Sequence, residues 1–174
     1  MKLNAADSKK ARKTFLFVAL VLGVGLIVLY KTAMLPAQNR QAEVAERGAK
    51  VMPFDLEQTM HVFQKLEDGG LQKVVVKDPS NKKQIALIQA HLKEEAERFR
   101  KGNFSDPAKI HGEAMPGLGE LKAGAARIDV RYTALPDGAD IRYSTKDPRL
   151  VTALHQWFSA QLSDHGRHAT EPMH

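Results

Sequence analysis

The sequence carries one pattern twice. Every element of the first copy is separated from its equivalent in the second by 69 residues, a spacing named here the repeat offset. Asp68-Gly69 and Asp137-Gly138 are turn signals, and each lies between two β-prone runs. Lys77-Asp78-Pro79 and Lys146-Asp147-Pro148 follow at the same offset, and an acid before proline is typical of a helix start. The repetition of turn, cap and helix in one order predicts an internal duplication of a ββα unit.

The two predicted units span residues 55–102 and 126–166, and a loop of residues 103–125 joins them. Two such units can form one four-stranded antiparallel sheet with both helices on one face, so the expected fold class is α+β. The offset also assigns faces to the strands. Because His61 is equivalent to Val130 on an alternating strand, we expect His61 to point towards the helices.

Apolar residues at three- and four-residue spacing predict the two helices, over residues 79–101 and 148–164. Asp78 and Asp147 are the expected N-cap residues, because each precedes a proline at the first helical position.

The N-terminus has the composition of a membrane anchor. Residues 1–13 carry +4 of the net charge of +6, and residues 14–30 follow without a charge. With the segment up to residue 35 they are long enough for a transmembrane helix over residues 14–35. The basic flank predicts a cytoplasmic N-terminus and an exported domain, residues 54–166. A cleaved signal peptide is the alternative, but the apolar run is long and no A-x-A-like site follows it.

The remaining segments are predicted to be connections. Residues 36–53 are polar and rich in small residues, as in a stalk, and residues 167–174 form an expected flexible tail. Outside the basic tail the net charge is only +2, which does not favour a nucleic-acid partner. The expected partners are the lipid bilayer, through residues 14–35, and a membrane protein.

The central loop contains the residues that we select as a candidate site. His111 and Met115 lie close together between glycines, and a Met-His pair recurs at His61. The chain has no cysteine, and imidazole with thioether in an exported domain suits copper. The candidate metal ligands are therefore His111, Met115, His61 and His91. The structural alternative for each histidine is a half-buried ring bonded to a backbone carbonyl or an acid.

The sequence contains no nucleophile elbow, no phosphate-binding loop and no dinucleotide-binding glycine fingerprint after a strand. The leading hypothesis is a single-pass, membrane-anchored binding or assembly module that takes copper or another soft metal through the His/Met loop. The alternative is an extracytoplasmic enzyme that uses His111 and Glu113 as acid and base.

Seven short motifs carry a resemblance to a known family. They are Met60-His61-Val62-Phe63, Asp68-Gly69-Gly70, Ala90-His91-Leu92, Phe104-Ser105-Asp106-Pro107, Ile110-His111-Gly112, Met115-Pro116-Gly117-Leu118 and Gln161-Leu162-Ser163-Asp164-His165-Gly166. From Phe54 onwards the chain resembles an uncharacterised family of small exported or membrane-anchored bacterial proteins, often labelled aspartate carbamoyltransferase. The sequence lacks the Ser-Thr-Arg-Thr phosphate loop of true carbamoyltransferases. The resemblance therefore implies a shared fold and a shared loop, and no established activity.

The charge asymmetry around residues 14–30 predicts the topology of the chain in the membrane. A C-terminal fusion to alkaline phosphatase should be active, because this enzyme functions only after export. A C-terminal fusion to a reporter that is active only in the cytoplasm should be silent. The reverse pattern of activities would contradict the predicted orientation.

Overall fold

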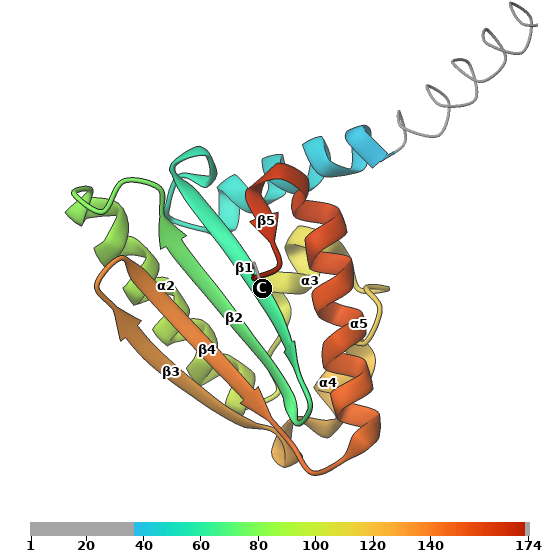
Figure 1. The fold of residues 1–174 in the computed structure, drawn as a ribbon. Helices are drawn as coiled ribbons and strands as arrows, with labels where there is room; N and C mark the ends of the chain where they lie inside the picture. The colour runs from blue at the N-terminus through green and yellow to red at the C-terminus, as the bar shows by residue number, and fades with distance from the viewer. Residues whose placement is uncertain (1–36, 173–174) are drawn as a thin grey trace, which may run out of the picture. The chain divides into compact units, whose positions relative to one another are not determined.

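The computed structural model describes residues 37–172, and from Arg40 onwards the chain belongs to one compact unit (Figure 1). Residues 37–51 are helical and are named here the N-terminal helix. The elements that follow are η1 (Leu56–Gln58), β1 (Thr59–Leu66), β2 (Gly69–Val76), α2 (Lys82–Arg100), α3 (Ser105–His111), α4 (Leu118–Gly124), η2 (Ala125–Arg127), β3 (Asp129–Leu135), β4 (Gly138–Ser144), α5 (Pro148–His165), η3 (Gly166–His168) and β5 (Ala169–Thr170).

The five strands form one mixed sheet in the order β3-β4-β2-β1-β5 (Figure 1). Its first four strands pair antiparallel, whereas β5 pairs parallel with β1, with His61 opposite Ala169. The α+β class is confirmed, but the predicted four-stranded antiparallel sheet is wrong. The strand β5 has only two residues, which is too short for an alternating side-chain pattern. Its position depends on backbone pairing with β1, and the sequence pattern therefore could not predict it.

The two hairpins meet in the middle of the sheet, where β2 pairs with β4. At this joint Gln72 lies opposite Ile141, which is its own equivalent at the repeat offset. Gly69 and Gly138 are equivalent in the same way. A Cβ at Gly69 would lie 2.2 Å from the Tyr143 carbonyl oxygen, and one at Gly138 would lie 2.0 Å from that of Val74. Both glycines are therefore required, because the backbones of the two units approach too closely for a side chain.

Both long helices cover the same face of the sheet. On this face the Tyr143 ring of β4 contacts Phe99 of α2, with ring centres 6.2 Å apart, and Trp157 of α5, with ring centres 5.7 Å apart. His61 is only 3% exposed on this same face, as the offset predicted. The aromatic rings between sheet and helices form the centre of the core.

The repeat extends to the buried faces of the helices. Every buried position of α2 has a buried equivalent at the repeat offset, in α5 or η3. The equivalent pairs are Gln84 and Ala153, Ile85 and Leu154, Ile88 and Trp157, Leu92 and Gln161, Glu95 and Asp164, Ala96 and His165, and Phe99 and His168. The two helices therefore present the same face to the sheet, although the residue types differ.

The helix starts agree with the prediction in one unit only. Asp147 is the N-cap of α5 and accepts the backbone N–H of Arg149, with proline in the first turn. Asp78 is not the cap of α2, contrary to the prediction. It forms a turn with Ser80, and the helix begins later than expected, after its N-cap Asn81.

The segment predicted as a stalk packs on the domain from Arg40 onwards. Val44 is fully buried in the core. Arg47 donates to the carbonyl oxygen of Ile110 at 2.6 Å, and Arg40 donates to that of His111 at 2.6 Å. The two arginines thus satisfy carbonyl groups at the C-terminus of α3, which have no partner within that helix.

Two further predictions concern the ends of the chain. The predicted transmembrane helix, residues 14–35, lies outside the described residues. Within residues 37–172, no helix has the length and apolar character needed to cross a bilayer. At the other end, the predicted flexible tail is ordered as far as β5, and the buried His168 contacts Glu57 at 3.0 Å.

We expect Asn81→Ala to lower the free energy of unfolding by about 1 kcal/mol, because the Asn81 side chain accepts the backbone N–H of Gln84. Asp78→Ala should have a smaller effect, since Asp78 bonds only to Ser80 outside the helix. Urea unfolding of the full-length protein in mild detergent measures both. Lys83→Ala, at an exposed position of α2, is the control. A greater loss for Asp78→Ala than for Asn81→Ala would contradict the assigned cap.

Candidate functional site

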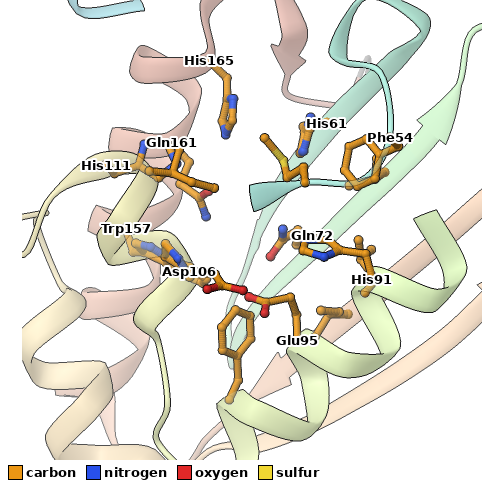
Figure 2. A pocket seen from close by; sticks show the side chains of 17 residues that line it. Phe54, His61, Gln72, His91, Glu95, Asp106, His111, Trp157, Gln161 and His165 are labelled. Carbon is orange, nitrogen blue, oxygen red and sulfur yellow. The ribbon is translucent and has the colours of Figure 1, made fainter. Parts of the chain in front are cut away.

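A small cavity of about 40 Å³ lies between the helix-covered face of the sheet and the helices α2, α3 and α5. Its wall is unusual for a protein core, because it combines four imidazole rings, a thioether, two carboxyl groups and two amides with aromatic rings. Figure 2 shows the labelled side chains around it. The residues that carry these groups, together with the Trp157 indole, are Met52, His61, Gln72, His91, Glu95, Asp106, His111, Trp157, Gln161 and His165.

One stripe of α5 supplies the part of the wall next to α3. Trp157, Gln161 and His165 recur at four-residue spacing, which places them on one face of the helix. The Gln161 amide points into the cavity in Figure 2. The helix α2 contributes His91 and Glu95 with the same spacing, from the other side. Regular helix geometry therefore brings polar side chains from two directions onto one enclosed space.

The His165 ring lies between two other imidazole rings, those of His61 and His111. Its ring centre is 4.7 Å from that of His61, with nearly parallel planes, and 5.0 Å from that of His111, with nearly perpendicular planes. Burial lowers the pKa of His61 to about 4. Burial also lowers the pKa of His165 well below its ordinary value, and the neighbouring histidines add to this effect. Both rings are therefore neutral at physiological pH, with nitrogen lone pairs that can bind a cation.

His111 is held in one orientation by a buried carboxylate. Its Nδ1 lies 2.9 Å from Oδ2 of Asp164, and the Arg40 guanidinium binds both carboxylate oxygens of Asp164, at 3.0 and 2.6 Å. Burial alone would raise the pKa of Asp164, but the hydrogen bonds from His111 and Arg40 outweigh it and lower the pKa. An ionised Asp164 accepts a hydrogen bond from Nδ1–H of His111, and in this tautomer the Nε2 atom keeps its lone pair.

Glu95 and Asp106 form a carboxyl pair on the opposite side of the cavity, where Figure 2 shows the two groups pointing towards each other. Burial, together with the negative charge of Asp106, raises the pKa of Glu95 to about 8. Arg98 and Lys109 bind Asp106 at 2.6 and 2.8 Å and keep it ionised. At neutral pH the pair therefore holds one proton, which remains on Glu95 in a hydrogen bond to Asp106.

Three polar atoms of the cavity wall have no hydrogen-bond partner. They are Nδ1 of His61, Nε1 of Trp157 and Nε2 of Gln161, and all three are buried. Within residues 37–172, only one other buried side-chain nitrogen or oxygen lacks a partner, on Arg47. Buried polar groups without partners are rare and need an explanation, and a cavity of about 40 Å³ has room for an ion or for a few water molecules.

The structure brings three of the four predicted metal ligands to this cavity. His61, His91 and His111 all line it, and the His91 ring lies edge-on to Phe54 with ring centres 5.7 Å apart. Met115 is buried but does not line the cavity. In the described part of the chain, no three His, Asp or Glu side chains are arranged to hold a metal ion. The histidines thus form one cluster, without a complete set of these ligands around a single point.

The predicted acid–base pair is not brought together. His111 is buried and faces the cavity, whereas the Glu113 side chain is 78% exposed and bonds to Lys122. Glu113 therefore cannot act on a molecule that His111 contacts inside the cavity.

Sequence reasoning missed Met52, His165 and the polar stripe of α5. Met52 belongs to the segment predicted as a stalk, and His165 lies next to the segment predicted as a flexible tail, so neither was selected as a candidate ligand. A comparison of the two repeats contains the missing signal. Gln161 and His165 are equivalent to Leu92 and Ala96, so two positions that are apolar in the first unit are polar in the second. Both Gln161 and His165 line the cavity, so this exchange of apolar for polar residues between the copies was the available signal.

Comparison of the chain with known protein families, curated proteins and solved structures finds no match.

We expect His61 to make the protein less stable in acid. In the unfolded chain a histidine has a pKa of about 6.5, whereas burial lowers the pKa of His61 to about 4. As the pH falls between these values, the unfolded chain binds a proton at this position and the folded protein does not. The free energy of unfolding should therefore decrease by on the order of 3 kcal/mol, and this loss should be complete near pH 4.

Urea unfolding at a series of pH values, for the wild type and His61→Leu, measures this effect as a difference between the two proteins. The raised pKa of Glu95 gives the opposite slope, with stability lost as the pH rises towards 8, but it is common to both proteins and cancels. A difference that does not change between pH 6.5 and pH 4 would contradict the assignment.

Proposed function

We propose that this protein is a membrane-anchored, exported binding module that holds one Cu(I) ion in the histidine-lined cavity. The observation that carries the proposal is the composition of the cavity wall, with four imidazoles and the Met52 thioether around one enclosed space. Residues 14–35 would anchor the module in the bilayer, and a membrane protein would exchange copper with it.

The size of the cavity limits the class of ligand. Pockets for organic ligands usually measure about 300–1,000 Å³. A space of about 40 Å³ is sufficient for a metal ion with at most a few water molecules. The size thus favours an ion over an organic substrate and supports a binding function over an enzymatic one.

The donor atoms select among ions. Neutral imidazole and thioether are soft or borderline donors and suit Cu(I), whereas calcium and magnesium require oxygen ligands. Zinc sites in proteins usually have three or four His, Cys or carboxylate ligands, and no three such side chains within residues 37–172 are arranged in this way. Two imidazoles with one thioether are a set of lower coordination number, which Cu(I) accepts more readily.

His61, His165 and Met52 are the proposed ligands. Imidazoles bound to one ion through bonds of about 2 Å have ring centres roughly 5–6 Å apart. His61 and His165 are stacked with ring centres 4.7 Å apart, so they are close enough to bind one ion after a rotation of either ring. The unpartnered Nδ1 of His61 would gain a partner on binding. His111 lies next to this pair, and its carboxylate contact is the arrangement that orients metal-bound histidines in many proteins.

Titration of the full-length protein in mild detergent with Cu(I), against a chromophoric Cu(I) chelator, tests the proposal. We expect one equivalent to bind. His165→Gln and Met52→Leu should each weaken the affinity by roughly tenfold or more, because each removes a ligand that a low-coordinate ion cannot replace. Met115→Leu is the matched control, since Met115 is as well buried as Met52 but lies away from the cavity. Absence of binding, or equal losses for the two methionine variants, would contradict the proposed site.

A further inference from the structure

A hollow on the surface lies next to the buried cavity. It has a volume of about 680 Å³, and its apolar lining comes from the N-terminal helix, the segment before β1 and α2. We name it the outer hollow, and its apolar residues are Ala45, Ala49, Met52, Phe54, Leu56 and Leu87.

Met52 and Phe54 line both the outer hollow and the cavity. The two side chains are only 7% and 4% exposed, so they close the passage between the two spaces. On the inner side the Phe54 ring is next to the histidines, with ring centres 5.9 Å from His61 and 5.7 Å from His91. Met52 and Phe54 are therefore the side chains whose rotation would connect the outer hollow with the proposed ligands.

Gly48 gives the Met52 side chain its position. A Cβ at Gly48 would lie 2.6 Å from the terminal methyl group of Met52, so any larger residue would displace that methyl group. Glycine is unfavourable inside a helix, and Gly48 lies within the N-terminal helix. The need for space beside Met52 is a physical reason for a glycine at this position.

A second hollow also adjoins the cavity, through Asp106. Its other residues include Arg47, Lys50, Arg98 and Lys109. A cation that approached from this side would pass four positive side chains, and Asp106 is already bound to two of them. Charge therefore disfavours this route for Cu(I). The outer hollow has a mostly apolar lining with the Met52 thioether, and its acids Asp55 and Glu57 outnumber its one lysine, Lys83.

We propose that Met52 and Phe54 form the access gate of the site, and that Cu(I) enters from the outer hollow with the Met52 thioether as its first ligand. This inference rests on the proposed function. The transfer is an exchange of ligands without a change of oxidation state. A bond from Met52 sulfur to copper replaces a bond to the donor, and bonds to His61 and His165 then replace the remaining ones.

Stopped-flow transfer of Cu(I) from its bicinchoninate complex to the full-length protein in mild detergent measures the loading rate. Gly48→Ala should slow loading by roughly tenfold, because it pushes Met52 against the wall without removing a ligand. Phe54→Leu should accelerate loading, because a smaller side chain opens the wall. Both variants should still bind one equivalent. Lys50→Ala, at the second hollow, is the control and should load at the wild-type rate, because Lys50 bonds to Glu46 at the surface and does not line the cavity.

The outcomes separate the two proposals. If the wild type binds one equivalent and the Gly48 and Phe54 variants load at its rate, the gate is refuted and the site remains. If Lys50→Ala alone changes the loading rate, copper enters by the second hollow and the gate is likewise refuted. If the wild type binds no Cu(I), the proposed function fails and the gate fails with it. Far-UV circular dichroism confirms folding, and Phe54→Leu still tests the gate if Gly48→Ala does not fold.

Discussion

The carboxylate of Asp164 joins three parts of the chain that are far apart in the sequence. It accepts hydrogen bonds from Arg40 of the N-terminal helix and from His111 of α3, and it is itself near the end of α5. Arg40 also donates to the carbonyl oxygen of His111, the last residue of α3, so one guanidinium binds both this carbonyl group and the carboxylate. Because the carboxylate is largely buried, loss of Arg40 would leave an uncompensated charge, which is far more costly than loss of a surface pair. Loss of His111 would remove one hydrogen bond from the same carboxylate. The orientation of His111, and with it this side of the cavity, depends on this contact.

The interior shows how a chain without cysteines stabilises a polar site. Beside the cavity, Trp157 packs edge-on against Phe99, Phe104 and Tyr143, with ring centres 6.0, 5.9 and 5.7 Å away. Such aromatic pairs contribute beyond the area that they bury. The same indole ring has its nitrogen at the cavity wall without a partner. Apolar packing and the polar site thus share one side chain, so a change at Trp157 would affect both.

The hairpins, the faces of the strands and the cap of α5 could be predicted from the sequence, because each depends on a local pattern or on the repeat. It placed His61 inward for a sound reason, since Val130 occupies the equivalent position. The short strand β5 and the Asn81 cap were not predictable, because pairing with β1 and a turn at Ser80 determine them and no periodicity reports either. For the candidate site, the Met115 prediction used proximity along the chain. Met52 instead reaches the cavity through the packing of the N-terminal helix, which the local sequence does not describe.

The duplication constrains how this protein can change. At Gln161 and His165 the second unit departs from an apolar solution, Leu92 and Ala96, which the first unit of the same chain retains. Reversion to that solution would remove two polar side chains from the interior and would favour folding, at the expense of the cavity. At these two positions a gain in stability is therefore opposed to retention of the polar cavity. Variants recovered by selection for thermal stability alone should accumulate there and lose the site first.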